Sequence, residues 1–277
     1  MHVLNLIIAL LLVQALRLSY LGVGNFLLQY MKGLFGRAHN LKFSPQPVVF
    51  GALVISLFSL GNITFEKYNQ TTQLRTAIQE ALDAHFAQQP IGLKIDSSIP
   101  LWGNPDARIT IVEFSDFECP HCQFTAFHLR GLLLQFREDV RLHFMNYPLD
   151  KSINDYVQRT IHPHAGLAAR AGVCAQKQGD FWSYHDDLFR NQKQINRKLL
   201  IELAKKRGWD GAEFNACLDS EPTLRQVRLE IAQAGNAKLT NTPTIIINGR
   251  IVKFPKSSDF IRAVIREELP RIRANTA

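Results

Sequence analysis

Two cysteines separated by two residues stand between a strand-like and a helix-like segment, and this arrangement constrains the fold more than any other feature. The β-branched run "ITIVEF", residues 109–114, precedes the pair, and the apolar-rich "CQFTAFHLRGLLLQF", residues 122–136, follows it. The first run predicts a buried strand and the second predicts a helix. The four residues 119–122, Cys-Pro-His-Cys, are therefore predicted to lie where a strand leads into the N-terminus of a helix.

A cysteine at a helix N-terminus is expected to be chemically active. The unpaired backbone N–H groups and the helix dipole stabilise a thiolate on Cys119, and His121 can add positive charge or a hydrogen bond. These effects place the expected pKa of Cys119 in the range of roughly 3.5 to 7.5 found in such motifs. A thiolate stabilised in this way is a good leaving group, so a disulfide between Cys119 and Cys122 would oxidise client thiols.

The cysteine pair could also have one of two other roles, as half of a metal site or as a structural disulfide. A zinc site would need two further ligands, and the chain offers no second CxxC, only single cysteines and His162 or His164. A purely structural disulfide in so tight a turn would close a very small loop and stabilise the fold little. The cysteine pair is therefore predicted to carry out redox chemistry. The alternative from another class of protein is a module that binds a metal such as copper.

A second element lies far downstream of the cysteines. Thr242-Pro243 precedes the strand-like "TIII". Such a proline often only begins an edge strand. Combined with the CxxC motif, it predicts a cis X-Pro bond that exposes backbone beside the cysteines, where a client peptide can pair.

The two motifs together resemble the DsbA-like branch of the thioredoxin superfamily. The resemblance is carried by "VEFSDFECPHC", residues 112–122, and "NTPTIIING", residues 241–249, and extends over about residues 100–268. It implies an α/β thioredoxin fold with an inserted helical subdomain. It also implies that Pro120 belongs to the catalytic motif.

The resemblance assigns roles to individual residues. It implies that Cys119 is the exposed nucleophile, that Cys122 is the resolving thiol and that Pro243 is the cis-proline. Glu113, six residues before the first cysteine, matches the buried acid of the family and is expected to help proton transfer at the resolving thiol. Pro-His between the cysteines resembles the oxidase DsbA, whereas Thr242 is also typical of the isomerases DsbC and DsbG.

The remaining cysteines, Cys174 and Cys217, fall in the predicted inserted helices. They could be two buried thiols, which is a common state of free cysteine. Several DsbA-like relatives carry a second bridge, and this resemblance implies a structural disulfide between the two residues. His162 and His164 are predicted to be capping and surface residues. Three aromatic residues, Phe181, Trp182 and Tyr184, are predicted to pack the inserted helices together, with a client groove as the alternative.

Hydrophobic patterns divide the chain into three parts, residues 1–65, 66–100 and 101–277. Residues 66–100 are predicted to form a helical stalk and a Gly-, Pro- and Ser-rich linker. Residues 101–277 are predicted to form the DsbA-like domain, with a helical insertion at about 152–236. Asn248-Gly249 between two short β-branched runs predicts a hairpin, and a capped amphipathic helix is predicted over 257–269.

The first 65 residues contain no acidic residue and only four basic ones. Two apolar stretches, at about 3–28 and 46–65, are predicted to span a membrane as an anchor. A cleavable signal peptide is the alternative for the first stretch, but no positively charged segment precedes it. The basic loop between the stretches is expected in the cytoplasm by the positive-inside rule, which places the following domain outside it. Such a compartment permits disulfides.

These features together predict an enzyme of the bacterial inner membrane with its catalytic domain on the periplasmic side. We expect reduced client proteins as substrates and no cofactor or bound metal. A separate membrane redox partner is implied because residues 1–65 contain no cysteine that could relay electrons. The net charge of +8 does not predict nucleic-acid binding, because the basic residues are scattered along the chain. The leading hypothesis is an oxidase, and the alternative is an isomerase or reductase kept reduced by a membrane donor.

Overall fold

The computed structural model of the chain describes residues 46–253 and 257–275. The chain divides into two compact units, residues 1–77 and 78–277, which we describe separately. Helix α3 is continuous from Gln46 to Phe86 and includes both the second predicted span and most of the predicted stalk. Within the described ranges, no helix combines the length and the apolar character that a membrane crossing requires. The first predicted span, 3–28, lies outside the described residues, and the anchor stays a prediction.

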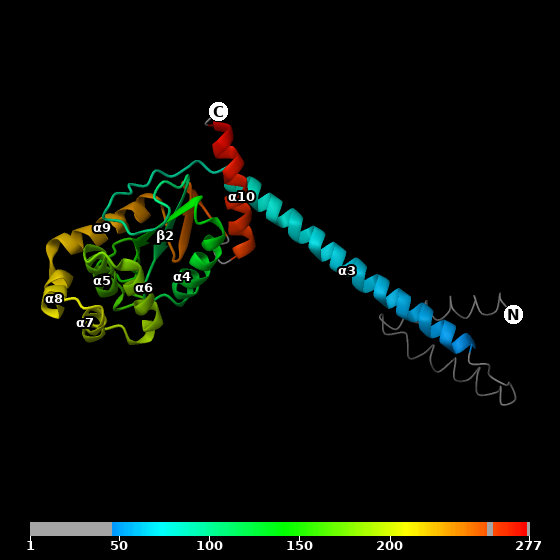
Figure 1. The fold of residues 1–277 in the computed structure, drawn as a ribbon, viewed down its shortest axis with the longest axis horizontal. Coiled ribbons are helices and arrows are strands. Elements are labelled where there is room, and N and C mark those ends of the chain that lie inside the picture. The colour runs from blue at the N-terminus through cyan, green and yellow to red at the C-terminus, as the bar shows by residue number, and fades with distance from the viewer. Residues whose placement is uncertain (1–45, 254–256, 276–277) are drawn as a thin grey trace. The chain divides into compact units, whose positions relative to one another are not determined.

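A β-sheet forms the centre of the second unit (Figure 1). It has five strands in the order β1-β3-β2-β4-β5. Its strands are β1 Leu101–Gly103, β2 Ile109–Ser115, β3 Val140–Asn146, β4 Thr244–Ile247 and β5 Arg250–Ile251. Strands β2 and β3 are parallel, because a helix connects them, and every other neighbouring pair is antiparallel. The predicted segments 109–114 and 140–149 correspond to the two central strands.

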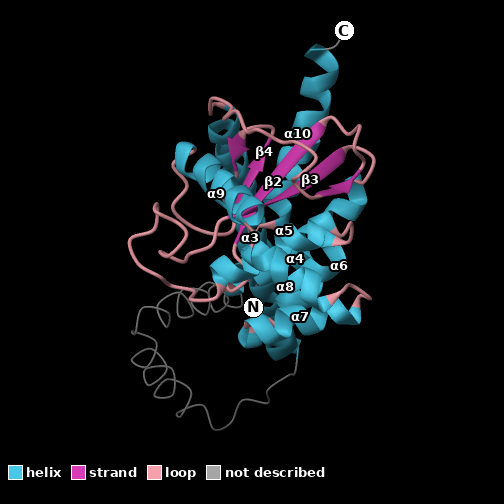
Figure 2. Cartoon of the chain, turned by 90° about the vertical axis from the view of Figure 1, so that its left-hand side faces the viewer, coloured by secondary structure: helices cyan, strands magenta, loops and turns pink. Residues whose placement is uncertain are grey.

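Helices cover both faces of the sheet (Figures 1 and 2). The helices of this unit are α4 Pro120–Leu133, α5 Ala165–Lys177, α6 Phe181–Arg190, α7 Arg197–Lys206, α8 Gly211–Asp219, α9 Glu221–Asn236 and α10 Ser258–Asn275. Alternate residues of β2 point to opposite faces. Ile109 and Ile111 pack with apolar residues of α4 and α10, whereas Val112 and Phe114 pack with residues of α5 and α9. Glu113 and Ser115 therefore share the sheet face on which α4 lies.

The predicted hairpin is confirmed, and one strand was missed. Asn248 and Gly249 join β4 to β5 with φ angles of +46° and +80°, as a two-residue hairpin turn requires. Strand β1 lies at the start of the predicted domain, where no strand was expected. It is three residues long and pairs antiparallel with β3, so its extended conformation depends on a partner distant in sequence.

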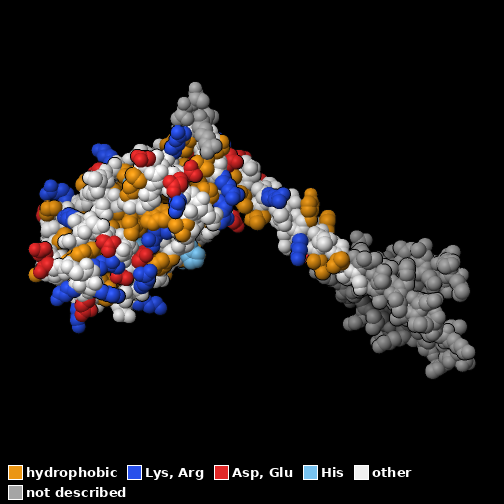
Figure 3. All heavy atoms as spheres, viewed as in Figure 1, with side chains coloured by type: hydrophobic (Ala, Val, Ile, Leu, Met, Phe, Trp, Pro, Cys, Tyr) orange, Lys and Arg blue, Asp and Glu red, His pale blue; other side chains and the backbone are white. Residues whose placement is uncertain are grey.

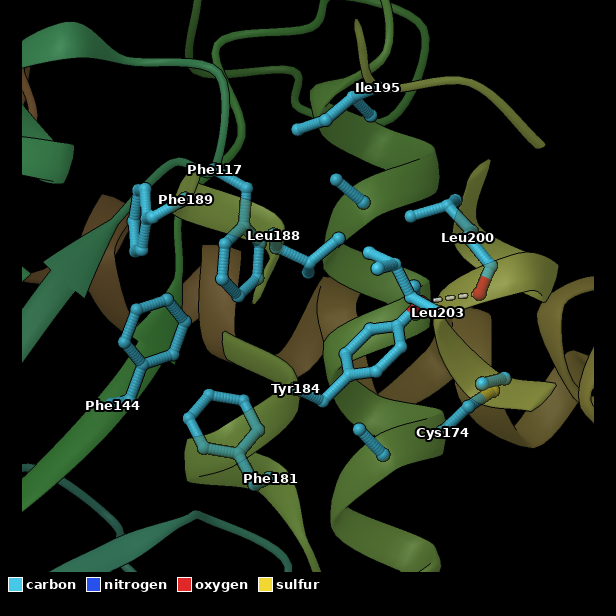
Figure 4. Packing of buried hydrophobic residues seen from close by; sticks show 14 of the residues in the cluster. Phe117, Phe144, Cys174, Phe181, Tyr184, Leu188, Phe189, Ile195, Leu200 and Leu203 are labelled. Carbon is cyan, nitrogen blue, oxygen red and sulfur yellow. Dashed lines mark hydrogen bonds between the residues drawn. The ribbon is translucent and has the colours of Figure 1, made fainter. Parts of the chain in front are cut away.

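The inserted helices pack on the sheet through an aromatic cluster, shown in Figure 4. Phe117 stacks on Phe144 of β3 with 5.1 Å between ring centroids, and Phe181 contacts the other side of Phe144. Tyr184 is fully buried, and its hydroxyl donates a 2.9 Å hydrogen bond to the carbonyl of Leu200 in α7. The predicted packing role of Phe181 and Tyr184 is confirmed. Trp182 is partly buried against the same cluster, and its indole N–H donates to the carbonyl of Leu101 in β1 at 2.7 Å. On the visible surface, basic side chains are interspersed with acidic ones (Figure 3).

Candidate redox site

The cysteine pair lies at the start of α4, directly after the loop that follows β2. Cys119 is the N-cap residue, and Pro120 occupies the first turn, where its missing N–H costs no hydrogen bond. The backbone N–H groups of Cys122 and Gln123 donate to the Cys119 carbonyl at 3.0 and 3.1 Å. The side chain of His121 is exposed in the same turn. The backbone N–H groups of His121 and Cys122 in this first turn lie close enough to the first sulfur to lower the pKa of Cys119.

The two thiols are in different environments. Hydrogen bonding by the Cys122 thiol lowers the pKa of Cys119 to about 5, and Thr242 and the backbone N–H groups of Cys122 and His121 add to this effect against the opposing effect of burial. Burial raises the pKa of Cys122 well above its usual value, and the neighbouring Cys119 raises it further. Cys119 therefore carries the thiolate while Cys122 keeps its proton.

Cys119 is less accessible than the resemblance implied. It is only 5% exposed, and Cys122 is 0% exposed. Gln192 lies beside the pair, because its side-chain amide donates to the carbonyls of Phe117 and Cys119 at 2.8 and 2.9 Å. Gln192 follows α6 and was not predicted, because nothing in its local sequence indicates a contact with residues more than 70 positions earlier.

The peptide bond between Thr242 and Pro243 is cis and lies beside the first cysteine. The sulfur of Cys119 lies 3.6 Å from the backbone carbonyl oxygen of Thr242, to which it donates only when it is protonated. These residues are 123 positions apart in sequence, and the pairing of β4 with β2 brings them together. The two motifs found in the sequence therefore form one site.

A buried acid lies behind the pair on β2. Burial raises the pKa of Glu113 to about 7, and the nearby hydroxyl of Ser115 and the charge of Arg130 oppose this rise. Its Oε1 atom has no hydrogen-bond partner among the described residues. Ser115 also lowers the pKa of Cys122, so its hydroxyl lies within reach of both the acid and the resolving thiol. Ser115 was missed, although its position two residues after Glu113 on a strand places both on one face.

The loop before α4 is held by a histidine that was expected at the surface. His162 Nδ1 lies 2.8 Å from Oδ2 of Asp116, whose side chain is 0% exposed. The prediction that His162 is a capping or surface residue is therefore wrong. His164 is half-exposed and pairs with Glu118, with 3.1 Å between its Nδ1 and the carboxylate.

Cys174 and Cys217 form a disulfide that joins α5 to α8. The S–S distance is 2.08 Å, the Cα atoms are 6.0 Å apart, and the two residues are 43 positions apart in sequence. Cys119 and Cys122 are free thiols, so the structure represents the reduced form of the CxxC pair. Within residues 46–253 and 257–275, no group of three His, Cys, Asp or Glu side chains is arranged to hold a metal ion.

The fold and the site together define a protein with a thioredoxin fold, an inserted helical region and a CxxC pair of free thiols at the start of a helix. A model of the thioredoxin family matches residues 97–267, which is more than half of the chain. The chain belongs to the thioredoxin family.

Solved structures share this fold. Oxidised BdbD from Bacillus subtilis is 25% identical with a TM-score of 0.56, and the match covers 66% of this chain and 100% of that one. The oxidoreductase DsbA from Xylella fastidiosa is 20% identical with a TM-score of 0.50 and covers 61% of this chain and 88% of that one. At the latter identity the likeness shows the fold alone.

Curated relatives include much longer proteins. The Na(+)/H(+) antiporter NhaA from Herminiimonas arsenicoxydans is 32% identical over 180 residues, which are 64% of this chain and 26% of the antiporter. The Na(+)/H(+) antiporter NhaA 1 from Mycolicibacterium gilvum is 30% identical over 184 residues, 64% of this chain and 28% of that protein. The chain spans about a quarter of the length of these relatives.

Proposed function

We propose that this protein introduces disulfides into secreted or envelope proteins by accepting electrons at the Cys119–Cys122 pair. The observation that supports this most directly is the asymmetry of the two thiols. Cys119 is stabilised as a thiolate at the start of α4, with its pKa lowered to about 5. Stabilising the thiolate stabilises the reduced form, which makes the corresponding disulfide a stronger oxidant.

The exchange proceeds in two balanced steps. A client thiolate attacks Sγ of Cys119 in the disulfide form, the bond to Cys122 breaks, and the Cys122 sulfur leaves with the electron pair and takes up a proton. A second client thiolate then attacks the client sulfur of the mixed disulfide and releases Cys119 as a thiolate. Two electrons pass from the client to the cysteine pair.

The neighbouring residues support these steps. Glu113, with a pKa raised to about 7, can supply the proton that Cys122 takes up and accept it again when the pair is reoxidised. Thr242 and Pro243 offer backbone beside Cys119 with which an extended client peptide can pair. Pro120 and the exposed His121 border the same sulfur from the first turn of α4.

We further propose that the domain works on the periplasmic side of the bacterial inner membrane. The acid-free apolar stretches in residues 1–65 and the basic residues between them support this placement. A fold relative from Salmonella enterica serovar Typhimurium is described as a periplasmic thioredoxin-like protein. Reoxidation of the pair needs a separate acceptor of two electrons, for which we propose a membrane redox partner.

The redox equilibrium of the pair against a glutathione series tests the direction of exchange. We expect a reduction potential well above the thioredoxin value of about −270 mV, toward the DsbA value of about −120 mV. The protein should then oxidise a reduced client, and the Cys119→Ser variant should not. A potential near that of thioredoxin, with insulin reduction and no client oxidation, would overturn the oxidase proposal in favour of a reductase or isomerase.

A further inference from the structure

Two histidine–carboxylate pairs connect the loop before the cysteines to the segment before α5. His162 Nδ1 lies 2.8 Å from Asp116 Oδ2, and His164 Nδ1 lies 3.1 Å from Glu118 Oε1. The partners in each pair are 46 residues apart in sequence. The two pairs differ in burial, because the His162 and Asp116 side chains are 17% and 0% exposed, whereas those of His164 and Glu118 are 49% and 14% exposed.

The Asp116 carboxylate is built into the wall of the redox site. Its Oδ2 also accepts the backbone N–H of Leu149 at 2.7 Å, and its Oδ1 accepts that of Glu118 at 2.8 Å. The backbone N–H of Asp116 itself donates to the sulfur of Cys122 at 3.4 Å. The carboxylate thus orders the loop that presents both cysteines.

This position creates an electrostatic conflict. Asp116 is three residues before Cys119, and its backbone carbonyl accepts the N–H of Cys119 at 3.0 Å. A buried carboxylate on this residue is expected to disfavour a second negative charge on Cys119, because like charges in a low dielectric repel strongly. Backbone N–H groups supply two of the contacts of Asp116, but they carry no net charge. Among the described residues, the only ion pair of Asp116 is with His162.

We propose that His162 is a positioning residue for disulfide exchange that, as an imidazolium, neutralises the buried Asp116 carboxylate and so permits a thiolate on Cys119. Asp116 can then order the loop without opposing the charge that the reaction requires. This inference rests on the thiol:disulfide chemistry of the proposed function and holds for either direction of exchange.

The charges around His162 favour its protonated form. The hydrogen bond to Asp116 raises the pKa of His162 most, burial opposes it, and the charges of Asp116, Cys119 and Glu118 raise it further. The loop at Leu149, which also contacts the Asp116 carboxylate, contributes only a backbone N–H there. Because the interaction is mutual, a thiolate that favours the imidazolium must be favoured by it to the same extent.

The variant His162→Asn separates charge from hydrogen bonding. The asparagine amide nitrogen lies near the position of Nδ1 and can still donate to Asp116, but it carries no charge. His164→Asn is the matched control, because it makes the same change in the more exposed pair, where solvent screens the charge.

Titrating the ultraviolet absorbance of the thiolate in the reduced protein measures the effect without any client. In His162→Asn we expect the pKa of Cys119 to rise by about one unit. The equilibrium with glutathione near neutral pH should then become about tenfold less oxidising. The control should change this equilibrium by less than about twofold. The difference between wild type and His162→Asn should disappear above the pKa of His162, where the wild-type imidazole is neutral too.

An unchanged thiolate pKa in a folded His162→Asn protein, or an equal rise in His164→Asn, would overturn the inference. If the variant does not fold, NMR titration of the wild-type protein tests whether the charges of His162 and Cys119 are coupled. The pKa of His162 should be higher in the reduced form, which carries the thiolate, than in the disulfide form, and equal values would refute the coupling. A protein that fails to oxidise clients yet shows these shifts would refute only the proposed oxidase function.

Discussion

Replacing Glu113 with glutamine should stabilise the folded protein above neutral pH while slowing disulfide exchange. Glu113 is 1% exposed, and one of its carboxyl oxygens has no hydrogen-bond partner among the described residues. Ionisation of Glu113 therefore lowers the free energy of unfolding. The acid lies where it could exchange a proton with Cys122, which gives a reason for its presence in the core. Glutamine keeps the shape of the side chain and removes the charge.

The expected magnitude follows from the pKa. Burial raises the pKa of Glu113 from 4.5 to about 7. The folded state consequently binds more protons than the unfolded state between these values, so the free energy of unfolding falls as the pH rises through this window. A tenfold change in proton affinity corresponds to about 1.4 kcal/mol, which makes the cost of ionised Glu113 up to about 3 kcal/mol above pH 7. Glu113→Gln should recover about 2 kcal/mol of this at about pH 8 and almost none at about pH 4.

Urea unfolding of the reduced proteins at both pH values measures the difference. Glu230, whose pKa burial also raises to about 7, gives both proteins the same additional pH dependence, so it cancels in the comparison. Glu138→Gln is the matched control, because the side chain of Glu138 is 75% exposed, and it should show no pH-dependent gain. In stopped-flow exchange, Glu113→Gln should react on the order of tenfold to a hundredfold more slowly.

One result would refute this reasoning directly. If Glu113→Gln is no more stable than wild type at about pH 8, or gains equally at about pH 4, the ionised carboxylate is not the source of the cost. If the variant is stabilised but its exchange kinetics are unchanged, the cost of the ionised carboxylate is confirmed. Glu113 then takes no part in proton transfer to or from Cys122.

The other predictions concern the remaining groups of the site and the second disulfide. Alkylation of Cys119 in the reduced protein should follow a midpoint near its pKa of about 5, while the other thiol of the pair stays unmodified until unfolding; modification of both thiols in the folded protein would contradict this. Replacing Cys174 and Cys217 together with alanine should lower the free energy of unfolding by about 4 kcal/mol, because the disulfide closes a 43-residue separation, and urea unfolding should detect it; a loss below about 1 kcal/mol would argue against the loop-entropy account. Ser115→Ala should raise the pKa of Glu113 by removing a nearby hydroxyl that favours its ionised form, measured by carbon-13 NMR, and a lowered pKa would show that the hydroxyl favours the neutral acid.

Local patterns predicted the central elements well. The β-branched run before the cysteines became β2, and the Asn248-Gly249 turn joined β4 to β5, because both depend on residues adjacent in sequence. Strand β1 was missed, since its three residues are extended only through pairing with β3. The inserted helices begin at Ala165, later than the expected residue 152, and the preceding segment is ordered by side-chain hydrogen bonds to Asp150.

The sequence by itself determined the reactive chemistry, because a CxxC motif between a strand and a helix leaves little choice in where the first sulfur lies. The tertiary structure alone decided what surrounds that sulfur. Ser115, Gln192 and the Asp116–His162 pair act on the cysteines through contacts that the sheet and the inserted helices create. Most of these partners lie many tens of residues from the cysteines in sequence, and hydrophobic periodicity does not reveal contacts over such separations. The strength of their electrostatic interactions depends on burial, which exists only in the folded chain.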